Sequence, residues 1–331
     1  MIKSELVIVR DKNNNPNIMR RYEKCLHREV DPSVEGDAVH PMFIIRGKEV
    51  DAIYLPEYLS CMIDGIPYSL PMQPPATMMD FDSVVECHRR KGDGWHCMTA
   101  VEWQFIADLI RLRESAGAEM LRGNTYFGCS HVMPMEHGIN KSENSAITLT
   151  GSGPESWFLY DNKEGIADFV GNVWKRIAGI RLVNGRYQYI KDNDAAAPDC
   201  DLSMDSKEWL DVLIDGKPLK VSVEDGEITI LATNEETGKE YGGDEWQNVG
   251  IDIDPIPDFV KALGIIPARH EGNREYFYAD AEESECVPVW GGSYRNASSG
   301  GSSALHLDNL RSFVYGGVGF VFFSAYYKVE S

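Results

Sequence analysis

Histidine and cysteine are the residue types in this sequence that could bind a metal or act as nucleophiles. There are eight histidines and seven cysteines, but no HxH, HExxH or CxxC spacing that would place two ligands on one metal. Cys129, His131 and His137 are close enough in the sequence to form a Cys/His site, although structural roles are commoner for such residues. No GxSxG, Walker A or dinucleotide-binding motif occurs. These residues favour a protein with no cofactor and no metal.

Acidic residues outnumber basic ones across the chain. The 331 residues include 52 Asp and Glu against 32 Lys and Arg, a formal net charge of −20. Such a field opposes broad binding to polyanions, so we expect no nucleic-acid partner. Residues 191–260 hold 19 acidic residues, five lysines and no arginine. This imbalance indicates a solvated insertion, with a cation-binding cluster as the alternative.

The apolar residues predict a globular protein that does not enter a membrane. No apolar run approaches the roughly 18 residues of a membrane span. The N-terminal MIKSELVIVRDKNNN lacks the apolar core of a signal peptide, so we expect synthesis in a cytoplasm without one. Unpaired, scattered cysteines agree with reduced thiols.

Hydrophobic periodicity predicts two helices and many short strands. The first helix covers residues 81–90 after Asp80. The second begins with a capping box at Thr99 and Glu102, followed by apolar residues such as Trp103 and Ile106 at helical spacing. Strands are expected at residues 6–9 (an edge strand followed by a loop), 43–45, 52–55, 67–70, 186–190, 219–223, 227–232, 276–278 and 319–325.

Glycine- and tryptophan-rich motifs must position any site in such a loop-rich chain. In order they are Gly94-Trp95-His96, Met98-Thr99, Glu102-Trp103, Gly171-Asn172-Val173-Trp174, Trp290-Gly291-Gly292 and Gly319-Phe320. Paired glycines allow backbones to approach closely, Asn172 can tie a loop through side-chain to backbone hydrogen bonds, and the tryptophans fill the remaining space. Rigid loops of this kind can carry a binding site whose exposed side chains change.

The ordered set of motifs resembles the formylglycine-generating-enzyme branch of the C-type lectin fold. Within that branch it is similar to the variable proteins of diversity-generating retroelements from gut bacteria and their phages. The resemblance runs from about Ile44 to Ala325 and implies an α+β fold with two main helices and short antiparallel strands. It divides the chain into an N-terminal strand and loop extension (1–40) and a lectin-fold domain (41–331), with an acidic insertion at about 191–285 and a variable region at about 291–325.

The catalytic cysteines of the related oxidases have no counterpart at the matching place. That segment runs from Gly291 to Ala297 without a cysteine, and Cys286 precedes it. Lys175, Arg176 and Val321 also depart from the family pattern. We therefore expect a non-catalytic protein. The alternatives are a metal-dependent oxidoreductase of the same superfamily, drawing on Cys129, His131 or His137, and a fixed structural virion protein.

The composition of residues 291–327 agrees with a diversified tract. Variation at AAC codons in these retroelements cannot produce Lys, Gln, Glu, Met or Trp, and none of the five occurs there. A Gly- and Ser-rich buried region is the alternative explanation. Within this tract, Leu305, Leu307 and Arg311 match the family framework. The alternation of leucine with His306 and Asp308 predicts a strand with the leucines facing inward.

The resemblance assigns ligand contacts to the positions that vary in similar proteins. They are Ser293, Tyr294, Arg295, Asn296, Ser299, Ser303, His306, Asp308, Asn309, Phe313, Tyr315, Gly316 and Gly317. We expect a solvent-facing patch built from Tyr294, Arg295, His306, Asp308, Phe313 and Tyr315. Its partner would be a protein or glycan receptor on a target cell. The resemblance places the protein on a phage tail or a bacterial surface, as a homo-oligomer or as part of a virion.

Overall fold

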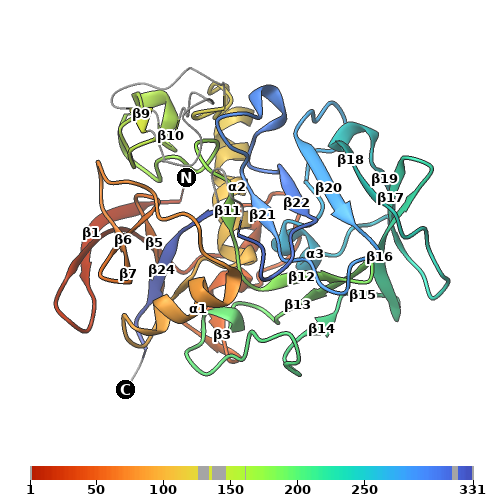
Figure 1. Cartoon of the computed structure of the whole chain (residues 1–331), viewed down its shortest axis with the longest axis horizontal. Helices are drawn as coiled ribbons and strands as arrows, with labels where there is room; N and C mark the ends of the chain where they lie inside the picture. Colours follow the sequence, from red (N-terminus) through yellow and green to blue (C-terminus); the bar gives the residue numbers. More distant parts are fainter. Residues whose placement is uncertain (1, 126–133, 136–146, 161, 315–319, 330–331) are drawn as a thin grey trace.

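The computed structural model has a mixed α+β fold that is rich in strands. It describes residues 2–125, 134–135, 147–160, 162–314 and 320–329. The described residues form three α-helices: α1 (Phe81–Arg89), α2 (Ala100–Ser115) and α3 (Asp258–Leu263). Helix α2 stands in the centre of Figure 1, between a five-stranded sheet and a six-stranded sheet. No helix in the described ranges is long and apolar enough to cross a membrane.

The five-stranded sheet joins the two ends of the chain. Its pairs are all antiparallel, and its strand order is β1 (Ser4–Arg10), β2 (Pro16–Glu23), β5 (Ala52–Pro56), β24 (Ser324–Tyr327) and β8 (Trp95–Cys97). Strand β1 lies at the edge, as expected. Residues 16–23, expected to be a loop, form β2 in the interior of the sheet. Residues 1–40 thus contribute two strands to the sheet that holds the C-terminal strand.

The six-stranded sheet contains two of the strands formed by residues 291–327. Its order is β18 (Tyr241–Glu245), β20 (Tyr276–Asp280), β22 (Leu305–Leu307), β21 (Val289–Trp290), β11 (Lys175–Arg176) and β23 (Val321–Phe322). Strands β18 and β20 belong to the acidic insertion: β18 pairs with β20, and β20 pairs with β22 of the tract. The insertion is therefore continuous with the sheet that presents the tract.

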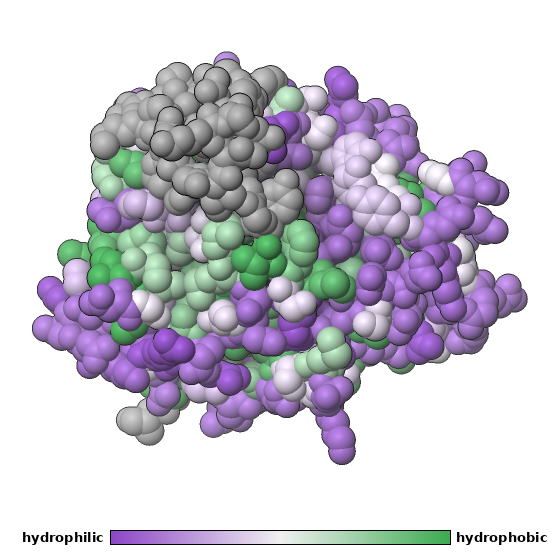
Figure 2. All heavy atoms as spheres, viewed as in Figure 1, coloured by the Kyte–Doolittle hydropathy of each residue, from purple (hydrophilic) through white to green (hydrophobic). Residues whose placement is uncertain are grey.

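The remaining strands form one larger sheet and three two-stranded pairs. The larger sheet includes an acidic hairpin at residues 217–232. The larger sheet has the order β12 (Ile180–Val183), β13 (Arg186–Tyr189), β16 (Lys217–Glu224), β17 (Glu227–Ala232) and β19 (Gly250–Asp252), with β14 (Leu210–Asp211) and β15 (Leu213–Ile214) beside it. The short pairs are β3 (Ile44–Ile45) with β4 (Lys48–Glu49), β6 (Ser60–Ile63) with β7 (Ile66–Ser69), and β9 (Pro134–Met135) with β10 (Ile147–Thr148). Figure 2 shows an almost wholly hydrophilic surface over β16, β17 and β19.

Both expected helices are confirmed, and so is the capping box. Asp80 caps α1 by accepting a hydrogen bond from the Ser83 backbone. Thr99 and Glu102 make the reciprocal bonds that start α2. The core beneath the tract is aromatic: Trp103 stacks on Phe169 with ring centroids 3.8 Å apart, and Trp290 lies 6.2 Å from Trp103.

Candidate recognition surface

The polar residues near the start of α2 form a buried hydrogen-bond network. The Glu102 carboxylate lies 2.8 Å from Nε2 of His96 and accepts a hydrogen bond from Nδ2 of Asn193 at 3.0 Å. Its second oxygen accepts from the Thr99 backbone at 3.0 Å. All four residues are buried. Because Asn193 also donates to the carbonyl of Met42, the network joins β8, the start of α2 and two loops into one rigid unit.

Asn172 performs the loop-tying role expected from the sequence. Its φ of 60° is left-handed, and its side-chain amide bonds both the backbone nitrogen and the carbonyl of Thr148. The Asn172 nitrogen donates to the carbonyl of Asn124 at 2.7 Å, and the Asn172 carbonyl accepts from the Tyr294 nitrogen at 3.1 Å. One residue therefore fixes two distant loops and the beginning of the tract.

The paired glycines Gly291 and Gly292 let the tract start against the core. Both have positive φ, 88° and 74°. A Cβ on Gly291 would lie 2.8 Å from the carbonyl oxygen of Phe169, and a Cβ on Gly292 would lie 2.8 Å from Cα of Gly300. Side chains are excluded at both positions, so the course of the backbone depends on glycine here.

The structure corrects the expected patch at Tyr294. Only 1% of Tyr294 is exposed, and its hydroxyl accepts a hydrogen bond from Nε of Arg295, whose guanidinium lies over the ring. The prediction of a solvent-facing Tyr294 is wrong because the Asn172 contact draws its backbone inward. Ser293 and Asn309 are also buried.

The other expected contact residues divide into three groups. Arg295 and Phe313 are exposed, and Asn296, Ser299, Ser303, His306 and Asp308 are half-buried. Tyr315, Gly316 and Gly317 lie outside the described residues. The exposed and half-buried side chains do not form one patch: Ser303 faces a cavity beside α2, whereas His306 and Asp308 lie on the outer face of the six-stranded sheet.

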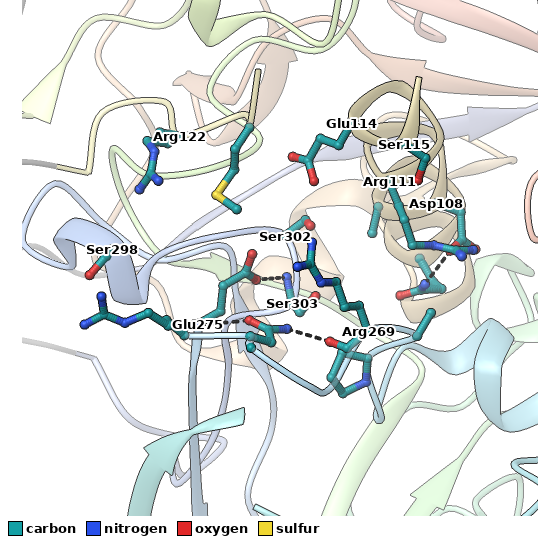
Figure 3. Close-up of a pocket in the computed structure, with 18 residues that line it drawn as sticks. Asp108, Arg111, Glu114, Ser115, Arg122, Arg269, Glu275, Ser298, Ser302 and Ser303 are labelled. Atoms are coloured by element: carbon teal, nitrogen blue, oxygen red, sulfur yellow. Dashed lines mark hydrogen bonds and ion pairs between the residues drawn. The ribbon is translucent and has the colours of Figure 1, made fainter. Parts of the chain in front are cut away.

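The cavity beside α2 has a volume of about 320 Å³ and is lined by three distant segments. Helix α2 contributes residues such as Glu114, residues 267–275 contribute Arg269 and Glu275, and the tract contributes Ser302 and Ser303. Figure 3 shows the side chains of Glu114, Arg269 and Glu275 pointing toward the middle of the cavity. The sequence patterns did not identify Glu114, Arg269 or Glu275 as site residues. A signal was present, because Arg269 and Arg274 follow an acidic segment, residues 191–260, that contains no arginine.

Glu275 is the most perturbed group in this cavity. Its carboxylate accepts a hydrogen bond from the Ser303 backbone at 2.5 Å. Burial, with repulsion from Glu114, raises its pKa to about 7. Arg122 and Arg269 also line the cavity, and neither forms an ion pair with the part of the chain that is described. The cavity thus offers both hydrogen-bond donors and acceptors to a polar ligand.

Replacing Glu275 by glutamine is expected to change how stability depends on pH. A carboxyl whose pKa rises from 4.5 to about 7 on folding binds more protons in the native state, so stability falls as pH rises between these values. Glutamine does not ionise, so the Glu275→Gln variant does not lose stability in this way. The Tm of the variant minus the Tm of wild type should therefore increase from pH 5 to pH 8. Thermal melts across that range test the expectation, with the exposed Glu271→Gln as control. Parallel curves for wild type and Glu275→Gln would contradict it.

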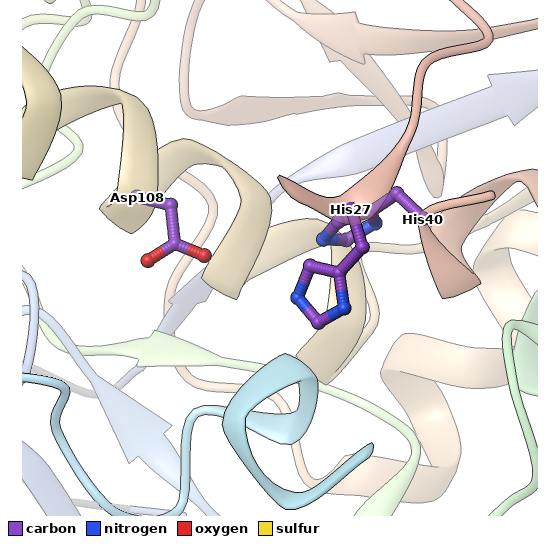
Figure 4. A group of neighbouring side chains, drawn as sticks. All are labelled: His27, His40 and Asp108. Atoms are coloured by element: carbon purple, nitrogen blue, oxygen red, sulfur yellow. The ribbon is translucent and has the colours of Figure 1, made fainter. Parts of the chain in front are cut away.

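His27, His40 and Asp108 form a buried cluster whose potential ligand atoms lie within 4.8 Å of one another (Figure 4). Nδ1 of His40 accepts a hydrogen bond from the Met42 backbone. In the neutral ring the proton is therefore on Nε2, which cannot then ligate a metal. Asp108 accepts hydrogen bonds from Gln104 and Arg111. In this arrangement the cluster does not fit a metal.

The six described cysteines are buried. Burial raises the pKa of Cys61 to about 11 and the pKa values of Cys25, Cys87 and Cys200 to about 12. The pKa values of Cys97 and Cys286 are raised as well. These six thiols remain protonated at neutral pH and are poor nucleophiles and metal ligands. Cys129, His131 and His137 lie outside the described residues.

Comparisons with known proteins assign no identity to these residues. No protein-family model matches the sequence, and no curated protein matches it significantly.

Proposed function

We propose that the protein is a non-catalytic receptor-binding protein with a C-type lectin fold of the formylglycine-generating-enzyme type, and that residues 291–327 are its diversified recognition surface. The observation that supports this proposal is the difference in burial between two sets of positions within the tract. Gly291, Gly292, Leu305, Leu307 and Arg311 are buried, whereas seven of the expected contact positions are at least partly exposed.

Backbone hydrogen bonds hold parts of the tract independently of the exposed side chains, although the half-buried Asn296 side chain also accepts a hydrogen bond from the Ser293 nitrogen at 2.8 Å. The Gly291 nitrogen donates to the carbonyl of Ala304 at 3.0 Å, and the Val287 nitrogen donates to the carbonyl of Asn309 at 2.8 Å. Exposed side chains can then change without loss of the fold, which is the property that a diversified binding surface requires.

The proposed partner is a protein or glycan receptor on a target cell. Display on a phage tail or a bacterial surface, as an oligomer or in a virion, would place several copies near one another. Several weak contacts would then combine into strong attachment.

Alanine at Arg295, Ser299 and Phe313 together is expected to reduce stability by only about 1 kcal/mol, because exposed side chains contribute little to folding. Tyr294→Ala, the matched control inside the tract, should cost about 3 kcal/mol or more. Chemical denaturation measures both. If the triple variant were unfolded, these side chains would belong to the core, and the proposal would be contradicted.

The genetic test is to sequence the DNA downstream of the gene. We expect a near-copy of the codons for residues 291–327, differing mainly at adenines, with a reverse transcriptase gene nearby. An invariant tract among sister genes would instead favour a fixed structural virion protein. About one tightly bound iron or copper per purified chain would favour the oxidoreductase.

A further inference from the structure

The outer face of the six-stranded sheet carries aromatic side chains from both the acidic insertion and the tract. In β20, Phe277 and Ala279 are buried while Tyr276 and Tyr278 are half-buried on the opposite face. In β22, Leu305 and Leu307 are buried and His306 is half-buried. Tyr278 and His306 are direct neighbours in the parallel register of these two strands. The alternation leaves the aromatic residues on the outside.

The aromatic rings form a continuous row, which we name the tyrosine face: Tyr241, Tyr276, Tyr278, His306 and Trp174. Ring centroids are 5.6 Å apart for Tyr241 and Tyr278, and 4.8 Å apart for Tyr276 and Tyr278. The row continues from Tyr278 to His306 at 4.7 Å and from His306 to Trp174 at 4.1 Å. Its outer end is open, since 58% of Tyr241 is exposed.

Glycine in β18 makes room for this row. A Cβ on Gly243 would lie 2.3 Å from the ring of Tyr278, so Tyr278 lies directly over bare backbone. Figure 2 shows a pale surface of intermediate hydropathy over β18 and β20, bordered by hydrophilic surface. Partly exposed aromatic rings in hydrophilic surroundings are typical of interaction sites.

Two carboxylates lie at one end of the tyrosine face. Ala279 and Leu307 are the last paired residues of β20 and β22, so Asp280 and Asp308 follow on adjacent strands. Within the described ranges neither carboxylate forms an ion pair with lysine or arginine. Burial, together with repulsion from Asp280, raises the pKa of Asp308 to about 6. Burial lowers the pKa of His306 to about 3, so His306 supplies no compensating charge at neutral pH.

We propose that the tyrosine face binds an arginine side chain of a protein partner. A planar guanidinium stacks on aromatic rings and pairs with carboxylates, so a single group would satisfy both features of this face. The two adjacent carboxylates favour a cationic ligand over a neutral glycan, because opposite charges attract. The inference rests on the proposed function, because His306 and Asp308 belong to the recognition tract.

The test is an NMR titration of the full chain with three capped pentapeptides, in which glycines alternate with two arginines, two citrullines or two lysines. We expect the arginine peptide to bind most tightly and to shift the resonances of the tyrosine face. Tyr241→Leu, which removes the π-system but keeps apolar bulk, and Asp308→Asn should each weaken binding about fivefold. Asp225→Asn, the same charge change in the exposed turn between β16 and β17, should change binding less than about twofold. Thermal melts verify that each variant is folded.

Four results would overturn the inference. If the citrulline or lysine peptide bound as tightly as the arginine peptide, a guanidinium would not be required. If no resonance of the tyrosine face shifted, the face would not be the binding site. An Asp225→Asn effect equal to that of Asp308→Asn would show attraction by net charge alone. Shifts of the face by cellotriose, without shifts by the arginine peptide, would favour a glycan. If the inference fails but the downstream repeat is found, the diversified surface stands and only its ligand class is wrong.

Discussion

Replacing Gly171 with alanine is expected to destabilise the protein by more than about 4 kcal/mol, enough to unfold many domains. Gly171 has a φ of 78°, and an added Cβ would lie 2.3 Å from the carbonyl oxygen and 2.6 Å from the carbonyl carbon of Asn124. These are backbone atoms and cannot rotate away. The Gly171 nitrogen also donates to the carbonyl of Gly291 at 2.8 Å, so a shift of this loop would displace the start of the tract.

Gly226→Ala separates backbone strain from the steric clash. Gly226 has a similar φ of 81° but no atom within 4 Å of an added Cβ. We expect this control to cost only about 1–2 kcal/mol, the cost of the left-handed conformation. Urea denaturation of both variants gives the comparison. Equal losses would mean that the contact between the Gly171 and Asn124 loops does not determine stability.

Local patterns in the sequence were sufficient to predict α1, α2 and the strand in the tract, whereas α3 was not expected. The capping box at Thr99 and Glu102 involves residues only three apart, and the alternation around His306 requires only the two-residue period of a strand. Such features depend on near neighbours along the chain. They are confirmed by α2 and β22.

Features that depend on distant partners could not be predicted in this way. A loop was expected after the first strand because of the turn formers DKNNNPN around Pro16. Residues 16–23 instead form β2, in which Arg20 is buried against Glu57, with Nε and Oε2 2.7 Å apart. Tyr294 has the residue type of an interface contact, but its burial depends on Asn172, more than a hundred residues earlier. A side chain with both apolar and polar parts is compatible with either environment, so the tertiary contact decides.

The candidate site was therefore predicted only in part. Framework positions such as Leu305 and Leu307 were identified from their alternation with polar residues. Glu275 and Arg269 were not, because they reach the cavity beside α2 from a loop that no local motif marks. Tyr241 and Tyr278 join the tract only through the pairing of β18, β20 and β22. Recognition surfaces built from several segments are visible only when strand pairing is known.

Glu285→Ala is expected to cost about 3–5 kcal/mol, because it leaves the buried Arg181 guanidinium without a counter-ion. Among the described residues, Arg311 would keep only the exposed Asp82, whose Oδ1 lies 2.7 Å from Nη1. Oε2 of Glu285 lies 2.7 Å from Nε of Arg311, and Oε1 lies 2.7 Å from Nη1 of Arg181. Glu285 is 1% exposed, and Arg311 and Arg181 are 7% and 6% exposed. The exposed Glu282→Ala, three residues earlier, is the control and should change stability by less than about 0.5 kcal/mol.

The pH dependence of the stability lost in Glu285→Ala tests whether the ion pairs are the cause of the loss. Burial alone would raise the pKa of Glu285, but hydrogen bonds from Arg311 and Arg181 outweigh burial and hold the pKa below its usual value of 4.5. The stabilisation is therefore complete above pH 4.5 and is lost as pH falls through the lower, folded-state value. The difference in unfolding free energy between wild type and Glu285→Ala should narrow accordingly below pH 4.5. A difference that stays constant with pH would assign the effect to packing.

The same variant tests how the framework holds residues 291–327. Besides its bonds to Glu285, Arg311 accepts a hydrogen bond at its carbonyl from the Phe81 nitrogen at 3.0 Å, so Glu285 connects the tract to the start of α1 and to β12. Under conditions where Glu285→Ala remains folded, amide hydrogen exchange should accelerate most at residues 305–313. Glu282→Ala should leave that exchange unchanged. Uniform acceleration across all sheets would show that Glu285 supports global stability rather than the tract, whereas acceleration confined to the tract would identify the buried Arg181–Glu285–Arg311 group as its anchor.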